Sequence, residues 1–251
     1  MPHPVFQPIR AGSQSASVRA TLVQEFVMLK RASLGLLGSV LMLASAQAVE
    51  INSKSLPGSN PFARASMLPY QLPQFDQIKD SDYAPAFAHG MAEQRAEILT
   101  IANHPAPPSF DNTLVAMERS GRLLDRASLV FFNLSSSNTN AAMQKLEARL
   151  APQLAAHHDA ILLDDKLFAR VDALYRQRAT LDLNPEQLRL VERYHTNFVR
   201  AGARLGPAQK STLRALNARI ATAQTAYEQR LLEANNQGAL MIEDVRQLDG
   251  L

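Results

Sequence analysis

The sequence predicts a mainly α-helical protein. Apolar residues recur every three or four positions through most of residues 81–237, and residues that commonly begin helices stand in front of these runs. One short segment, 239–242, has the composition of a strand. The chain has 251 residues, 46% hydrophobic and 20% charged, so it is too apolar and too balanced in charge for general disorder.

The first 48 residues resemble a leader. Met28-Leu29-Lys30-Arg31 is followed by a largely apolar stretch, 32–44, and then by Ala46-Gln47-Ala48. A basic start, a short apolar stretch and an Ala-x-Ala site are typical of a secretory signal peptide, while a short buried core helix is the alternative. We expect cleavage between Ala48 and Val49, which N-terminal sequencing of the exported protein would check.

Residues 28–48 are therefore the predicted signal peptide, and residues 1–27 are interpreted as an over-extended start, with translation beginning at Met28. The apolar stretch is too short for a stable membrane anchor. We expect an exported protein, located in the periplasm, and the absence of cysteine agrees with a fold that needs no disulfide chemistry there.

An extended docking arm is expected over residues 49–80. This segment is rich in proline and serine, which favour irregular structure. Its apolar residues indicate that it lies against the surface of a domain: Phe62, Leu68, Tyr70, Phe75 and Ile78.

A helical lobe is expected over residues 81–237. Ser81 or Asp82 can cap its first helix, with Pro85 in the first turn, and this helix should stop before the proline-rich segment 104–108. Asp111 is expected to cap a short helix, and Gly121 to separate it from a second helix that reaches Leu134.

Residues 135–140 are predicted to form a polar loop before a longer helix from Met143 to Ile161. Pro152 lies inside that helix, so we expect a kink or a local break there. Asp164 and Asp165 should begin the next helix, and Asn184-Pro185 a further one whose apolar face runs to Leu205.

The last helix has the clearest pattern. Its apolar positions alternate by three and four, as in the seam of an antiparallel helical hairpin. These positions are Leu213, Leu216, Ile220, Ala223, Tyr227 and Leu231. Residues 235–238 should end this helix, and 238–251 would begin the next element.

The charge of the chain argues against a nucleic-acid partner. The formal charge of +3 arises in residues 1–48, which hold four basic residues and one acidic residue, so the remainder is neutral. Residues 119–230 are locally basic, with 17 basic and 10 acidic side chains. We interpret them as solvated arginine faces, and a surface facing an acidic partner region or an anionic substrate is the alternative.

Two histidine motifs are candidates for chemical sites. His157-His158 precedes Asp159, but adjacent helical residues point about 100° apart, so a partly exposed pair is favoured over a metal site. Glu192 and His195 have the i, i+3 spacing of di-iron carboxylate bundles, which need a second copy that this chain lacks. Since His195 also falls on an apolar face, a hydrogen-bonded core histidine is favoured.

No self-contained active site is predicted. The carboxylate pairs Asp164-Asp165 and Glu243-Asp244 stand where helix capping explains them. No histidine is followed by glutamate, so the zinc-protease motif His-Glu-x-x-His is absent, and so are the nucleophile elbow, the P-loop and the dinucleotide fingerprint. We assign no catalytic, cofactor-binding or metal-ligating residue.

Several stretches nevertheless resemble a known family in order and spacing. They are Asn60-Pro61-Phe62, Leu68-Pro69-Tyr70-Gln71, Phe75-Asp76-Gln77-Ile78, Phe110-Asp111-Asn112-Thr113 and Glu192-Arg193-Tyr194-His195. The chain resembles the N-terminal portion of bacterial peptidyl-dipeptidases of the Dcp type, which are zinc metallopeptidases related to oligopeptidase A and thimet oligopeptidase. The resemblance covers nearly all of residues 49–251.

The resemblance implies a two-lobed helical enzyme that removes C-terminal dipeptides from short peptides inside a deep channel. In that family a His-Glu-x-x-His helix and a downstream glutamate hold one zinc ion, and the motif glutamate activates the attacking water. None of these residues has a counterpart here. The interpretation is an N-terminal lobe that shapes the channel, inactive without a C-terminal catalytic portion; a complete, non-catalytic helical binding or structural module is the alternative.

Overall fold

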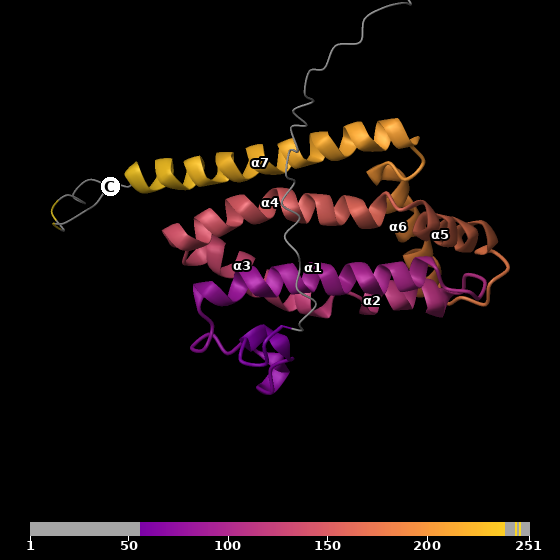
Figure 1. The fold of residues 1–251 in the computed structure, drawn as a ribbon, viewed down its shortest axis with the longest axis horizontal. Helices are drawn as coiled ribbons and strands as arrows, with labels where there is room; N and C mark the ends of the chain where they lie inside the picture. Colours follow the sequence, from indigo (N-terminus) through magenta and orange to yellow (C-terminus); the bar gives the residue numbers. More distant parts are fainter. Residues whose placement is uncertain (1–55, 239–243, 245, 247–251) are drawn as a thin grey trace, which may run out of the picture. The chain divides into compact units, whose positions relative to one another are not determined.

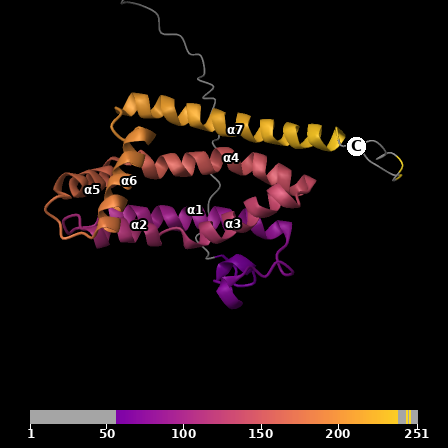
Figure 2. The same ribbon diagram turned by 180° about the vertical axis from the view of Figure 1, so that it is seen from behind.

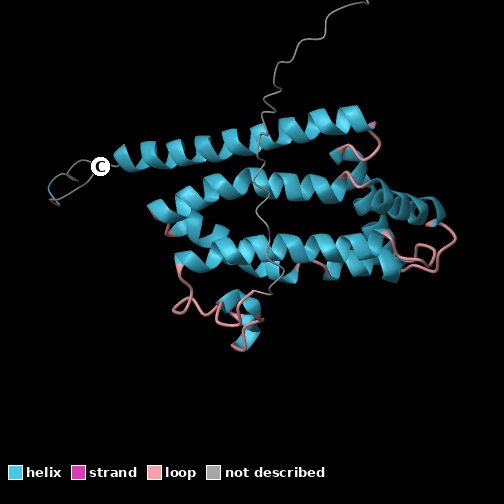
Figure 3. Ribbon diagram, in the orientation of Figure 1, coloured by secondary structure: helices cyan, strands magenta, loops and turns pink. Residues whose placement is uncertain are grey.

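A computed structural model of the chain describes residues 56–238, Asp244 and Arg246. The leader, the cleavage position between Ala48 and Val49, and the predicted strand 239–242 lie outside the described residues. Within the described part every regular element is a helix (Figure 3), which confirms the mainly α fold class. No helix among these residues has the length and apolar character needed to cross a membrane.

The arm contains two short 3-10 helices, η1 (Pro61–Ala63) and η2 (Pro69–Gln71). The Asn60 side chain caps η1 by accepting a hydrogen bond from the backbone N–H of Phe62 at 2.9 Å. Phe62 is buried, with its ring 5.4 Å from that of Tyr83, so the predicted docking is correct there. It is wrong at Tyr70, which is 97% exposed.

Helix α1 (Asp80–Ala102) begins slightly earlier than predicted. Lys79 occupies the cap position, and Asp82, expected as a cap, instead accepts a hydrogen bond from the Lys79 N–H at 2.8 Å. Pro85 therefore lies in the second turn. A proline there removes the helical hydrogen bond to the Ser81 carbonyl, a cost that the packing of α1 against its neighbours must offset.

The next elements are a π-helical turn, η3 (Phe110–Val115), and helix α2 (Ala116–Arg119). Ser109 caps this segment, not Asp111: the Ser109 hydroxyl accepts from the N–H of Asn112, and the Asn112 side chain accepts from the N–H of Ser109. Gly121 forms the predicted break with φ of 77°.

Helix α3 (Arg122–Ser137) extends into the predicted polar loop. The hydroxyls of Ser136 and Ser137 donate to the Asn133 carbonyl at 3.0 and 2.7 Å, which satisfies the last turn, so the loop shortens to residues 138–140. Helix α4 (Ala141–Leu162) runs through Pro152 without the expected break. Packing of α4 against α1 and α7 offsets the proline's cost of roughly 3 kcal/mol.

Helices α5 (Asp165–Gln177) and α6 (Pro185–Ala201) begin where the sequence predicts. Asp164 accepts from the Leu167 N–H at 2.7 Å, and Asn184 from the Gln187 N–H at 2.9 Å. Gly202, with φ of 99°, ends α6 before Leu205, so the predicted apolar face was too long.

Helix α7 (Pro207–Gln237) lies along α4 and antiparallel to it (Figures 1 and 2). The hairpin prediction is therefore confirmed, but the predicted seam is wrong. Leu216, Ile220, Tyr227 and Leu231 are 46%, 44%, 66% and 48% exposed. The face that meets α4 is polar: Asn217 donates to Asp159 at 2.7 Å, and Gln229 to the Gln144 carbonyl at 2.8 Å.

The apolar core consists of two clusters. The first joins the arm, α1, α3 and α4 around the fully buried rings of Phe87 and Phe131. The second joins the end of α1 with η3, α2, α5 and α6 around Leu114, Leu167 and Phe198. Helix α7 contributes to neither, which leaves it attached mainly through its polar contacts with α4.

Candidate functional site

The most connected polar group in the described residues lies between α5 and α6. His195 is buried, and its Nε2 atom lies 3.2 Å from Asp172 and 3.3 Å from the Arg204 guanidinium. Its ring stacks on Tyr175, with centroids 3.7 Å apart and planes 4° apart. The Arg178 guanidinium covers the other face of the stack, 4.0 Å from the Tyr175 centroid.

This arrangement confirms the prediction of a hydrogen-bonded core histidine. The Nε2 atom already has polar neighbours, and one ring face is taken by Tyr175. Asp172 in turn forms an ion pair with Arg176 at 2.7 Å. One oxygen of its carboxylate therefore contacts Arg176 and the other contacts His195. The group links α5 to α6 and holds the imidazole in place.

Glu192 does not join His195. Its carboxylate lies 3.9 Å from Arg178, at the end of α5, and 3.5 Å from Arg189, three residues earlier in α6. The i, i+3 spacing thus brings these two side chains onto one helix without bringing them to one site. No metal ligation follows from this motif.

The His157-His158 pair is partly exposed, as expected: His157 is buried and His158 is exposed, while the neighbouring Asp159 is buried. The His157 ring lies 2.7 Å from the Gln94 side chain of α1, whereas Asp159 accepts from Asn217 of α7. The two side chains therefore point to opposite neighbours of α4. Their burial comes from partners more than fifty residues away, which the local pattern does not show.

The side chains that the structure describes do not form a zinc site. Among residues 56–238, 244 and 246, no three histidine, aspartate or glutamate side chains converge closely enough to hold a metal ion. Asp164 and Asp165 serve other roles, since Asp164 caps α5 and Asp165 pairs with Lys210 at 2.5 Å. Asp244 pairs with Arg246, and Glu243 lies outside the described residues.

His104 belongs to a fixed proline-rich loop. Arg170 of α5 donates to the carbonyls of His104 and Ala106, both at 3.2 Å, and to the Asn112 side chain at 2.7 Å. The guanidinium thereby ties the loop to the cap of η3. Nothing in the local sequence distinguishes Arg170 from the many other basic residues around it.

Burial of the His157 ring, with Arg95 and His158 nearby, lowers its pKa from 6.5 to about 4. An unfolded chain binds this proton below pH 6.5 and the folded chain only near pH 4, so the free energy of unfolding should fall as pH drops through that interval. We expect a loss of roughly 2 kcal/mol, smaller than the full shift because the two cationic neighbours are exposed to solvent.

Urea unfolding of residues 49–251 at pH 7 and pH 4.5 would measure that loss. The matched comparison is His157→Gln against His158→Gln, since the second histidine is exposed. The His157 variant should show a weaker pH dependence. The His158 variant should stay close to the wild-type dependence, because burial of the His157 ring, the largest cause of its lowered pKa, is unchanged in it. Equal behaviour of both variants would contradict the assignment.

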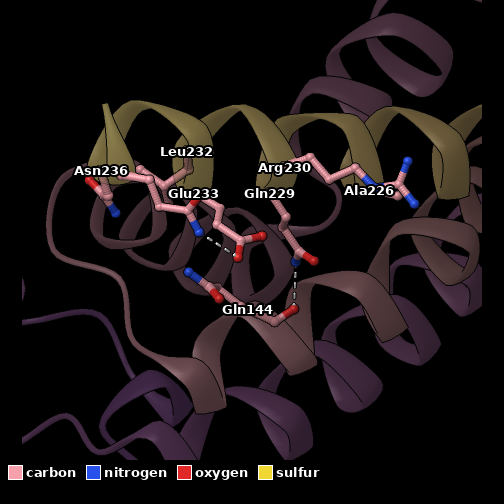
Figure 4. A pocket seen from close by; sticks show the side chains of 8 residues that line it. Gln144, Ala226, Gln229, Arg230, Leu232, Glu233 and Asn236 are labelled. Atoms are coloured by element: carbon pink, nitrogen blue, oxygen red, sulfur yellow. Dashed lines mark hydrogen bonds between the residues drawn. The ribbon is translucent and has the colours of Figure 1, made fainter. Parts of the chain in front are cut away.

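A groove of about 670 Å³ lies between the start of α4 and the end of α7 (Figure 4). Its lining is mostly polar and includes Gln144, Gln229, Arg230 and Glu233. Gln229 already donates across the groove to α4, which makes it part of the α4–α7 contact. No catalytic arrangement follows from these residues.

A more apolar hollow of about 760 Å³ lies between the arm and α3. Its lining includes Met67, Tyr70 and Leu129, which are 94%, 97% and 74% exposed. Tyr70 and Gln71 have φ of 57° and 56°, a left-handed conformation that is strained for residues with a side chain. No local residue pattern indicates this turn, since neither residue is glycine or asparagine.

Together these features define a class of protein: a helical lobe whose buried polar groups tie helices to one another. No family model matches the chain. Over 193 residues it is 47% identical to a dipeptidyl carboxypeptidase of Salmonella typhimurium, a match that covers 77% of this chain and 28% of that protein. The dipeptidyl carboxypeptidase of Escherichia coli is 46% identical over 192 residues, with 76% and 28% covered.

A more distant relative is oligopeptidase A of Salmonella typhimurium, 21% identical over 182 residues. The resemblance predicted from the sequence motifs is confirmed: the chain is similar to an N-terminal portion of the dipeptidyl carboxypeptidases. It spans about 28% of the length of these relatives.

Proposed function

We propose that the chain supplies the N-terminal, channel-shaping portion of a zinc-dependent peptidyl-dipeptidase, an enzyme that releases C-terminal dipeptides from short peptides. The observation that carries this proposal is the 47% identity over 193 residues to a dipeptidyl carboxypeptidase. The mainly helical fold agrees with it.

In this proposal the residues that cleave the peptide bond belong to the remaining portion of such an enzyme. The sequence has no His-Glu-x-x-His motif, and the described residues bring no three potential metal ligands together. Zinc would supply an activated water in that other portion. This chain would act sterically: α4 lies between the long helices α1 and α7, and such a wall would admit short or unfolded peptides and exclude folded proteins.

A chimaera tests the proposal. Residues 49–251 would replace the matching portion of the Escherichia coli dipeptidyl carboxypeptidase, and dipeptide release from an N-terminally blocked peptide would be measured in the presence of zinc. We expect activity from the chimaera and none from the isolated chain. The control is the Escherichia coli protein without its matching portion. Dipeptide release by the isolated chain, or a folded chimaera without activity, would contradict the proposal.

We also propose that the chain is exported to the periplasm, with Val49 as the first residue of the mature protein. The support is the order of basic residues, apolar stretch and Ala-x-Ala site in residues 28–48. Short peptides in that compartment would then be the substrates of the intact enzyme.

A non-catalytic binding module is the second candidate. The apolar hollow between the arm and α3 favours it, because concave apolar surfaces with a few polar groups are common ligand sites. Peptide binding by the isolated chain together with an inactive chimaera would favour this candidate.

A further inference from the structure

Helix α7 presents a row of apolar side chains to solvent. We call this row the α7 outer stripe: Leu216, Ile220, Ala223, Tyr227 and Leu231. All five are exposed, and the four large ones expose between 44% and 66% of their surface. They are spaced by four, three, four and four residues, so they form a continuous ridge about 22 Å long on one side of the helix.

The stripe is not needed to attach α7 to the rest of the lobe. The opposite side of the helix contacts α4 through Asn217 and Gln229, and Thr225 is buried on that side. Among the described residues, α4 is the main neighbour of α7. The helix therefore keeps its polar side inward and its apolar side free.

This distribution fits a second helix packed on the outside. Ridges spaced by four residues interlock with a similar ridge on another helix, and a contiguous exposed apolar row is typical of a protein–protein contact. Arg219 and Arg230 are exposed along one edge of the stripe. The matching helix would carry an apolar ridge and acidic residues along the facing edge.

We propose that the α7 outer stripe docks a helix from the portion of a dipeptidyl carboxypeptidase that this chain does not match. This inference rests on the proposed function. The matched relatives are much longer than the chain, which spans about 28% of them, so they contain polypeptide that could cover the stripe. An antiparallel second copy fits less well, because Arg219 and Arg230 of both copies would lie along the same edge and repel.

Stability measured in two settings tests the docking. The variant Ile220→Glu/Tyr227→Glu places two charges in the stripe, and Ala215→Glu/Thr222→Glu places two charges with the same spacing on exposed positions outside it. Each would be made in residues 49–251 alone and in the chimaera with the Escherichia coli protein. Melting temperatures come from circular dichroism and oligomeric state from light scattering.

We expect both variants to shift the melting temperature of the isolated chain by about 2 °C or less, because all four positions are exposed. In the chimaera the stripe variant should lower it by about 10 °C and the control by about 2 °C, since only the stripe becomes buried. If the double variant does not fold, Tyr227→Ser alone should give about half the shift in the chimaera.

Equal shifts in the two settings, or no shift in the chimaera, would overturn the docking. A dimeric isolated chain that the stripe variant makes monomeric, with an unaffected chimaera, would assign the stripe to a second copy and also overturn it. Dipeptide release separates this inference from the proposed function. An active chimaera that tolerates the stripe variant overturns only the docking, whereas an inactive chimaera that the variant destabilises supports the docking and contradicts the function.

Discussion

Phe131→Ala is expected to lower the free energy of unfolding by about 4 kcal/mol. The Phe131 ring is fully buried in the cluster that joins the arm, α1, α3 and α4. It meets Tyr83 edge-on, with centroids 5.1 Å apart, and Phe87 likewise at 5.4 Å. Truncation would leave a cavity and remove both aromatic contacts, and the surrounding helices can collapse only partly.

The adjacent Phe132 is the matched control for this prediction. It is 40% exposed and lies at the rim of the same aromatic group, 5.2 Å from Phe131. We expect Phe132→Ala to cost about 1 kcal/mol, because much of its ring is already in water. Urea unfolding of residues 49–251 measures both variants, and equal losses would show that Phe131 is not the centre of the cluster.

The parts of the fold that the sequence predicted correctly depend on local chemistry. Asp164 and Asn184 cap α5 and α6 because an oxygen of a side chain bonds an N–H three residues ahead, and nothing distant competes. Ser109 and Asp111 show the limit of this reasoning. Both are good caps, and the reciprocal bonds between Ser109 and Asn112 decide for the serine.

Periodicity correctly predicted that α7 has an apolar side but wrongly placed that side in the seam of the hairpin. An apolar row normally faces the core, because burying it is the main favourable contribution to folding. In α7 the side-chain amides of Asn217 and Gln229 donate hydrogen bonds to α4, and these bonds hold the polar side of the helix inward and the apolar side outward. These partners lie 58 and 85 residues away in sequence, so no local pattern could show them.

At the candidate sites, too, the sequence predicted what depends on neighbouring residues but not the contacts with residues distant in the chain. His195 was correctly placed in the core, since its neighbours in the helix are apolar, yet its partner Asp172 was not foreseen. The His157-His158 pair was expected to be partly exposed, because adjacent helical residues point about 100° apart. The sequence did not show which of the two is buried. It is His157, which contacts Gln94 across the α1–α4 interface.

Gly90→Ala is expected to destabilise the protein by about 2–3 kcal/mol, the reverse of the usual effect in a helix. Alanine is normally favoured over glycine inside a helix by about 1 kcal/mol. Gly90, however, lies where α1 crosses α3, and a Cβ atom there would stand 2.8 Å from both the Cα and the N atom of Leu124. Backbone atoms cannot move aside as a flexible side chain can, so the two helices would have to separate.

Gly58→Ala is the matched control, because a Cβ atom at Gly58 meets nothing within 4 Å. We expect its free energy of unfolding to change by about 0.5 kcal/mol or less. Urea unfolding of both variants measures the difference. A Gly90 variant as stable as the wild type would mean that α1 and α3 are not in backbone contact, and the first core cluster would then need another explanation. A large loss at Gly90 alone would show that this glycine sets the distance between the two helices around Phe131.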